Sequence, residues 1–253
     1  MLFDDRYEVF LADTAESRNL HYRLRYFVYH EETGWEQDYD VIRTRREKDG
    51  FDSCSRHFLV KDKCTHEWVG GMRLIVMPFK ELPVTRLCGL VDSVEQASQE
   101  SCFEISRLFV LPDYRCGSRK IRRGDEDNDQ ACHQNNAGAY HEIVLGLIRA
   151  AREYGYRHNL NNWFFLIEPS LARSIRSLGF DLAECGSGIE HHGLRRPYHS
   201  DLHVAFNMLF SRKNEVSKMF LQKKSYLLFS ELEVQQTGLL SNHLNQQSAV
   251  CQE

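Results

Sequence analysis

The most constraining feature of the sequence is an apolar run near its centre, CFEISRLFVL, which spans residues 102–111. Its β-branched and aromatic members predict a strand, yet Glu104 and Arg107 interrupt it. A buried carboxylate or guanidinium without a partner costs several kcal/mol or shifts its pKa. The run therefore leaves two interpretations. Either the two charges pair with each other and brace a sheet, or one face of the strand opens into a polar cleft.

A turn follows this strand at once, because Pro112 fixes its φ angle and Gly117 permits a positive one. A strand, a turn that carries Arg115, and then a helix would direct backbone N–H groups toward an anion or an acyl carbonyl. The segment EISRLFVLPDYR, residues 104–115, resembles the central strand and turn of acyltransferases with the GCN5-related N-acetyltransferase (GNAT) fold.

More narrowly, this segment resembles the branch that contains acyl-homoserine lactone synthases, N-acyl amino acid synthases and the acyltransferases associated with PEP-CTERM/exosortase systems. The resemblance covers roughly residues 20–200. It implies a mixed α/β (α+β) fold in which helices flank a twisted central mixed sheet.

A second motif lies near the amino terminus, where Arg25 and Tyr29 precede a Gly-Trp pair with Trp35 and the spaced acids Asp49 and Asp52. This arrangement resembles the amino-terminal signature of acyl-homoserine lactone synthases, although Tyr29 stands where that family usually has Phe. The resemblance implies that these residues shape the acceptor pocket. An exposed Trp in a polar segment is costly, so we expect Trp35 to pack over the cleft as a lid.

The surrounding segment, residues 36–53, is strongly charged and lacks a helical or strand period. This composition predicts a loop that orders only with ligand. Apart from Asp49 and Asp52, which carry the resemblance, its charges can equally form a solvated surface.

Arg73 stands inside an apolar run at 68–78, which a short polar turn connects to a strand expected at 57–62. Arg73 is either a snorkelling edge residue or a residue that reaches the cleft. In the resembled families the matching arginine faces the active site.

A third motif, GSGIEHHGLRRPY at residues 186–198, resembles a stretch of the exosortase-associated acyltransferases that homoserine lactone synthases do not usually carry. The matching positions are His192, Arg196 and Tyr198, and the resemblance implies that they contribute to substrate binding.

Histidines cluster near this motif, and the spacing of His199 and His203 suits two metal ligands on a helix. However, the pattern of residues 201–210 favours a strand, in which positions i and i+4 lie far apart. We therefore predict that the protein has no metal site.

Residues 119–136 form a polar insert without a core-forming pattern, and we expect it to be mobile. Its basic half either solubilises the protein or, with Arg115, contacts an acidic carrier protein or its pantetheine arm. These basic residues are Arg119, Lys120, Arg122 and Arg123. In the resembled fold a glycine-rich loop occupies this place, so the insert weakens the case for a coenzyme A donor.

The remaining pattern predicts one domain. A helix at 138–154 would connect the central strand to a parallel strand at 163–169, and a helix capped by Ser170 would follow. We expect residues 1–211 to form the acyltransferase domain and residues 212–253 to form an amphipathic helix and a disordered tail.

Composition narrows the possible partners and compartment. A net charge of −4 gives no overall attraction to nucleic acid. No run approaches 18 apolar residues and the first ten residues lack a signal-peptide pattern, so we expect a cytoplasmic protein without stable membrane insertion. The eight cysteines form no CxxC pair, which favours reduced and mostly buried thiols.

Together these features predict an N-acyltransferase that moves a fatty acyl group from acyl carrier protein, or from acyl-CoA, to the amine of a small acceptor such as an amino acid. The acyl-phosphopantetheine thioester would be a co-substrate, and we expect no tightly bound cofactor. One alternative is an acyl-homoserine lactone synthase that uses S-adenosylmethionine. Another is a non-catalytic module that binds acyl groups or carrier protein.

The expected chemistry assigns three roles. Glu104, directly or through water, would accept a proton from the acceptor. Backbone N–H groups from Leu108 to Val110 would stabilise the oxyanion at a bulge. Charged side chains would orient the acceptor through charge-assisted hydrogen bonds. These side chains are Arg25, Asp49, Asp52, Arg73 and Arg107.

Overall fold

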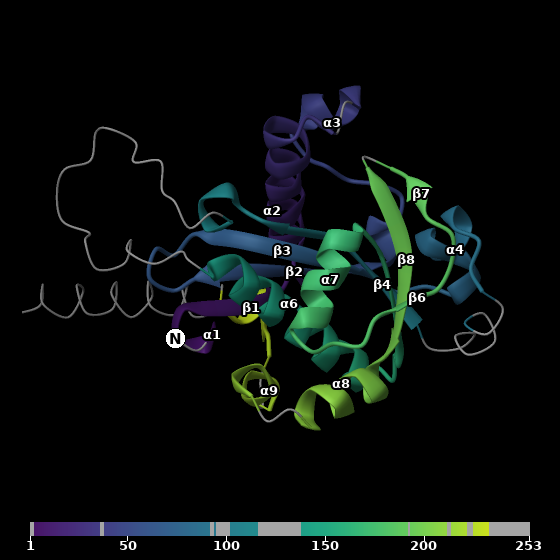
Figure 1. Cartoon of the computed structure of the whole chain (residues 1–253). Coiled ribbons are helices and arrows are strands. Elements are labelled where there is room, and N and C mark those ends of the chain that lie inside the picture. Colours follow the sequence, from purple (N-terminus) through teal and green to yellow (C-terminus); the bar gives the residue numbers. More distant parts are fainter. Residues whose placement is uncertain are drawn as a thin grey trace, which may run out of the picture.

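The computed structural model describes residues 3–35, 38–91, 94, 102–115, 138–191, 193–211, 214–221 and 225–232 of the 253-residue chain. Within these residues, helices flank one open mixed sheet (Figure 1), which confirms the predicted fold class.

The sheet follows the order β6-β8-β5-β4-β3-β2-β1-β9, and β7 pairs with β8. The strands are β1 (Tyr7–Leu11), β2 (Ser55–Asp62), β3 (Trp68–Ile75), β4 (Cys102–Val110), β5 (Asn162–Ile167), β6 (Ala183–Glu184), β7 (Ile189–Glu190), β8 (Leu194–Asp201) and β9 (Leu227–Leu228). β4 pairs with β5 and β1 with β9 in parallel, and the other pairs are antiparallel. The expected hairpin of β2 with β3 and the parallel β4–β5 pair are thus confirmed.

The α-helices are α1 (Phe3–Arg6), α2 (Ala15–Tyr26), α3 (Tyr39–Thr44), α4 (Pro83–Leu87), α6 (Ala139–Arg157), α7 (Pro169–Ser177), α8 (Leu202–Ser211) and α9 (Glu215–Phe220). A π-helix at Phe27–Glu32 continues α2, and short 3-10 helices lie at Asp52–Cys54, Phe79–Glu81 and Pro112–Tyr114. Residues beyond 211 also join the sheet, since β9 pairs with β1.

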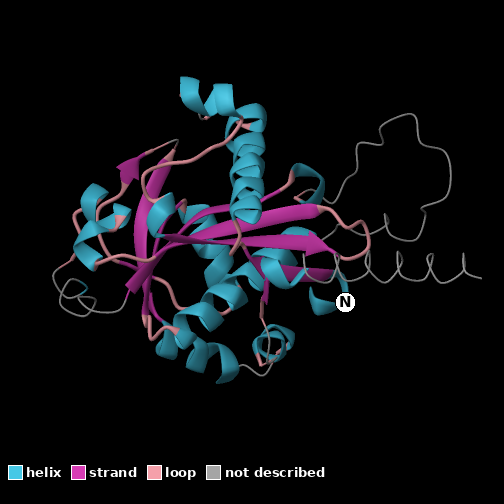
Figure 2. Ribbon diagram, turned by 180° about the vertical axis from the view of Figure 1, so that it is seen from behind, coloured by secondary structure: helices cyan, strands magenta, loops and turns pink. Residues whose placement is uncertain are grey.

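α2 and α6 cover opposite faces of the sheet. Neighbouring residues of a strand point to opposite faces, and His57 of β2 contacts His21 of α2, whereas Phe58 contacts Tyr154 of α6. Figure 2, the view from behind, accordingly brings the side of the sheet that carries α2 toward the viewer.

The two central strands separate before they end. β4 and β5 are paired only from Cys102 to Ile105, opposite Asn162 to Phe165. Beyond this point β4 continues to Val110 and β5 to Ile167 without pairing with each other. The gap falls beside Glu104 and Arg107, and it places the two charged residues at an opening in the sheet.

Residues 202–211 form helix α8, so the prediction of a strand over 201–210 was wrong. The sequence also has apolar residues at helical spacing, and these are the residues that are buried: Leu202, Ala205, Phe206 and Leu209. The Asp201 carboxylate accepts a hydrogen bond from the Val204 N–H at 3.0 Å, which caps the first turn.

Two further expectations need correction. Part of the expected loop at 36–53 is helix α3, because the Asp38 carboxylate caps it by accepting hydrogen bonds from the Asp40 and Val41 N–H groups. Helix α7 is not capped by Ser170, since it begins at Pro169 with Glu168 at the cap position. Proline suits the first turn of a helix, where its missing N–H is not needed.

The described cysteines are unpaired. Cys88, Cys102 and Cys185 are buried, whereas Cys54 and Cys64 are exposed.

Candidate functional site

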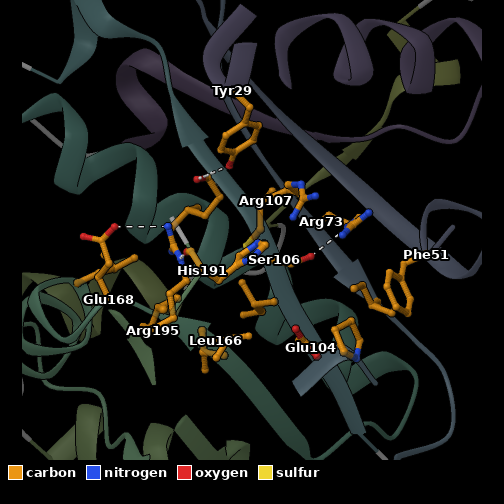
Figure 3. Close-up of a pocket in the computed structure, with 18 of the residues that line it drawn as sticks. Tyr29, Phe51, Arg73, Glu104, Ser106, Arg107, Leu166, Glu168, His191 and Arg195 are labelled. Carbon is orange, nitrogen blue, oxygen red and sulfur yellow. Dashed lines mark hydrogen bonds and ion pairs between the residues drawn. The ribbon is translucent and has the colours of Figure 1, made fainter. Parts of the chain in front are cut away.

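A cavity of about 630 Å³ opens where β4 and β5 separate. Figure 3 shows Phe51 and Glu168 on opposite sides of it, with Glu104, Ser106 and Arg107 of β4 between them. The apolar lining contributed by α6, β5 and α7 includes Ile148, Phe165, Leu166, Ile167, Leu171 and Ile175. The cavity thus carries charged side chains along β4 and a cluster of apolar side chains from α6, β5 and α7.

Six charged side chains beside the cavity form a closed ring in which guanidinium and carboxylate groups alternate. Three arginines and three acids compensate one another, so the ring carries no net charge. In order, it runs Arg25, Glu47, Arg107, Asp49, Arg73 and Asp52, and it closes on Arg25.

The most buried part of the ring lies around Arg25, Asp52 and Arg73. The Arg25 guanidinium lies 2.6 Å from the Asp52 carboxylate and also pairs with Glu47, and Arg25 is fully buried. Arg73 bridges Asp49 at 2.6 Å and Asp52 at 2.9 Å. Because each ion has hydrogen-bonded partners of opposite charge, burial of the cluster is tolerated.

The ring fixes the ionisation of its acids. Burial alone would raise the pKa of Glu47, but Arg25 and Arg107 outweigh it and hold that pKa below its ordinary value. The pKa values of Asp49 and Asp52 are lowered in the same way, despite burial, by hydrogen bonds to Arg73 and His57 respectively and by the neighbouring arginines. The ring therefore stays ionised at neutral pH.

Glu104 lies outside the ring although it is only three residues from Arg107. Its Oε2 accepts a hydrogen bond of 2.8 Å from the Val84 N–H of α4. It is only 2% exposed, and burial raises its pKa to about 7. Among the described residues no donor bonds to Oε1, and Glu104 lines the cavity. Glu104 and Arg107 thus do not pair, and the cleft interpretation of the central strand is the one that holds.

The pairing of β4 with β3 is irregular at Arg107, close to where a bulge was expected. Arg73 pairs with Ser106 and Gly71 with Phe109, so one residue of β3 lies opposite two of β4. Arg107 has a φ of 50°, which is unusual for a residue other than glycine. The irregularity turns backbone atoms of β4 away from the regular ladder at the edge of the cavity.

Aromatic rings connect two sides of the cavity. The Tyr29 and Trp35 rings stack with centroids 6.2 Å apart. The Arg107 guanidinium lies over Tyr29 at 5.7 Å, and the Arg195 guanidinium lies over Trp35 at 5.5 Å. We call this column, Arg107-Tyr29-Trp35-Arg195, the cation-aromatic stack. Its two guanidinium contacts are attractive because the ring faces are electron-rich.

The structure brings seven of the predicted site residues together at the cavity. Those that line the cavity are Tyr29, Trp35, Asp49, Arg73, Glu104, Arg107 and Leu108. Arg25 and Asp52 do not line it; they are fully buried behind it, and their partners are ring members. They hold other charges of the site, and their expected role in binding an acceptor stays a prediction.

Four other predicted site residues do not line the cavity either. Val110 is buried in regular pairing with Gly70. Arg196 pairs with Glu184 at 2.5 Å, and Tyr198 is buried beneath the Arg176 guanidinium. Both lie on β8 and contact residues of β6 and α7. Arg115 pairs with Glu32 at 2.7 Å and does not line the cavity. His192 and the basic residues 119, 120, 122 and 123 lie outside the described residues.

Two important residues were not identified from the sequence. Glu47 closes the ring with Arg25 and Arg107. Arg195 supports Trp35 and lies 3.4 Å from Glu168. The only signal for Glu47 was its position two residues before Asp49 in a charged run.

Two of the described histidines near the third motif bond to asparagine side chains. His199 bonds to the Asn162 side chain at 2.9 Å and His203 to the Asn161 side chain at 3.1 Å. No metal-binding group of three or more His, Cys, Asp or Glu occurs in the described part of the chain. Within the same residues no helix is long and apolar enough to cross a bilayer.

Comparison with known proteins agrees with the fold. Residues 24–121 match the family model of the acetyltransferase (GNAT) domain. The curated protein sequences contain no significant match. The domain match and the fold support an acyltransferase with a GNAT-type fold.

Solved structures extend the similarity over most of the chain. BjaI, a CoA-dependent acyl-homoserine lactone synthase solved with SAM and isopentyl-CoA, has a TM-score of 0.56 and 17% identity, over 88% of this chain and 92% of that one. FeeM, an N-acyl amino acid synthase from uncultured soil microbes, has a TM-score of 0.53 and 11% identity, over 82% and 97%. At these identities the likeness shows a shared fold.

Proposed function

We propose that the protein transfers a fatty acyl group from an acyl-phosphopantetheine thioester to the amine of a small acceptor such as an amino acid. The observation that carries this proposal is Glu104, a carboxylate in the cavity with one open oxygen and a pKa raised to about 7 by burial. A general base works best when its pKa lies near the working pH.

The reaction balances with this one base. Glu104 takes a proton from the acceptor ammonium, and the resulting amine attacks the thioester carbonyl carbon. As the C–S bond breaks, the second nitrogen proton passes to the departing thiolate. The products are an amide, a thiol and a protonated Glu104, which returns its proton to solvent.

The other features of the cavity contribute to binding either the acyl donor or the acceptor. The apolar lining contributed by α6, β5 and α7 suits a fatty acyl chain, since its burial there is favourable. Main-chain N–H groups at the β4 irregularity near Leu108 are the proposed donors to the oxyanion. The charge ring fixes the position of Arg73 and Arg107 beside the acceptor.

The donor and cellular context are further parts of the proposal. We propose acyl carrier protein as the donor, with acyl-CoA as the alternative, and cytoplasm as the compartment. A relation to the PEP-CTERM/exosortase-associated acyltransferases rests on the segment 186–198 alone.

A direct assay tests the proposal. The purified protein is incubated with acyl carrier proteins or acyl-CoA of several chain lengths and with pooled amino acids, and products are identified by mass spectrometry. We expect N-acyl amino acids together with free thiol in equal amounts. If no donor yields an acylated amine, the proposed function is wrong and a non-catalytic binding module replaces it.

The second candidate is an acyl-homoserine lactone synthase, which the fold of BjaI favours. The same incubation with S-adenosylmethionine as the added amine separates the two candidates. An acyl-homoserine lactone as the main product would overturn the amino acid assignment.

A further inference from the structure

Two guanidinium nitrogens beside the cavity remain open. Arg73 bonds through Nε to Ser106 at 3.0 Å and through Nη1 to Asp49 and Asp52. Arg107 bonds through Nε and Nη2 to Glu47 and through Nη2 to Asp49. Within the described residues, Nη2 of Arg73 and Nη1 of Arg107 have no hydrogen-bond partner, and both residues line the cavity. Two such donors suit a carboxylate.

The adjoining wall of the cavity is apolar. It consists of Phe51, Ile75, Pro83 and Leu87. Figure 3 shows Phe51 on the same side of the cavity as Arg73. α4 supplies Pro83 and Leu87, and the bond from the Val84 N–H to Glu104 ties this helix to the proposed base. The wall thus stands beside both the open guanidinium groups and Glu104.

The chemistry of this wall is selective. None of the four side chains has a polar atom, so a polar or charged group placed against them loses water without gaining a hydrogen bond. An apolar group placed there is favoured, because its surface is removed from water. The side chain of Leu87 is 54% exposed, which leaves room at the rim for a bulky occupant.

We infer that the acceptor is an α-amino acid with an apolar or aromatic side chain. Its carboxylate binds Nη2 of Arg73 and Nη1 of Arg107, its amine faces Glu104, and its side chain packs on the wall of Phe51, Ile75, Pro83 and Leu87. This inference rests on the proposed function and specifies the substrate class of the same site.

A competition experiment tests the inference. The wild-type protein receives one acyl donor and an equimolar mixture of Leu, Phe, Met, Gly, Ser and Asp, and the ratios of N-acyl products are measured. We expect Leu, Phe and Met products to exceed the others by at least ~10-fold, since a hydrophobic pocket separates side chains by factors of this size. The amides of Leu and Phe, which lack the carboxylate, should react at least ~10-fold more slowly than the free acids.

A substitution at the rim of the cavity should change which acceptors are preferred. Leu87→Asp should lower the yield of Leu and Phe products and raise that of a Lys or Arg acceptor, because the new carboxylate attracts a cationic side chain. Leu221→Asp is the matched control, since Leu221 is also exposed, at 67%, and does not line the cavity. The control should keep the wild-type product ratios.

The outcomes are distinguishable. Acylated amino acids without preference for side chain, amides that react as well as acids, or a Leu87→Asp variant with unchanged ratios would overturn this inference and leave the proposed function standing. The absence of any acylated amine would overturn both.

Discussion

The carboxylates beside the cavity behave in two opposite ways. Glu47, Asp49 and Asp52 are ion-paired, and the arginines lower their pKa values below the ordinary range despite burial. Glu104 is as buried as Glu47 and Asp52, but among the described residues its hydrogen-bond partner is a backbone N–H alone, and burial raises its pKa to about 7. Burial raises the pKa of each of these carboxylates, and the presence of a guanidinium partner decides whether the net shift is downward or upward.

This difference gives the ring and Glu104 different roles in the site. The ring has permanent charges and therefore fixes geometry at any physiological pH. Glu104 exchanges its proton within that range and therefore suits acid–base chemistry. A site built only of paired acids would be rigid but unable to accept a proton.

Breaking the ring should have the largest effect. Arg25→Ala leaves Glu47 and Asp52 buried with one partner fewer each, and we expect a loss of about 3 to 5 kcal/mol in the free energy of unfolding. Urea denaturation measures this. Arg43→Ala removes the exposed pair of Arg43 with Asp40 and should change stability by less than about 1 kcal/mol. Equal effects of the two variants would show that the ring does not stabilise the protein.

Removing the carboxylate of Glu104 should have the opposite result, because it should greatly lower activity without destabilising the protein. Glu104→Gln keeps the shape and the acceptor for the Val84 N–H, but it cannot take a proton. We expect kcat/KM to fall ~100- to 10,000-fold. Glu16→Gln, on the exposed side of α2, is the control. A Glu104→Gln variant that turns over at the wild-type rate would rule out Glu104 as the base.

The pH dependence of stability sharpens the same comparison. Folded Glu104 keeps its proton up to about pH 7, whereas the unfolded carboxyl loses it near its ordinary pKa of 4.5. The stability that the protonated form contributes is therefore lost as the pH rises across this window. Glu104→Gln cannot ionise, so its stability relative to wild type should grow by about 1 to 3 kcal/mol between pH 4.5 and 8 and then stay constant.

Denaturation of both proteins at a series of pH values measures that growth. A constant difference from pH 4.5 to 8 would mean that the pKa of Glu104 is not raised in the folded protein.

Local patterns predicted the strands well, because period and turn chemistry are properties of neighbouring residues. β3, β4 and β5 were recognised from apolar runs bounded by turns, and charges inside such runs pointed to the cavity at Glu104, Arg107 and Arg73. Helix α8 was misread because its apolar residues satisfy both a strand and a helix period.

The ring could not be predicted, because its contacts join residues far apart in the sequence. Glu47 pairs with Arg25, 22 residues away, and with Arg107, 60 residues away. In a charged segment without period, nothing local distinguishes Glu47 from its solvated neighbours. For the same reason Arg25 was expected to touch the acceptor, although its partners are other ring members.

The smallest predicted effect concerns the link between the cation-aromatic stack and the irregular part of β4. The Tyr29 hydroxyl donates a hydrogen bond of 3.2 Å to the Leu108 carbonyl. Tyr29→Phe keeps the ring that stacks on Trp35 and Arg107 but removes this bond, so we expect a loss of about 1 kcal/mol in the free energy of unfolding. Tyr156→Phe, at a residue that is 69% exposed, should cost nothing measurable. If Tyr29→Phe also lowers kcat with KM unchanged, the bond positions the β4 backbone for the reaction; loss of stability alone would limit its role to bracing.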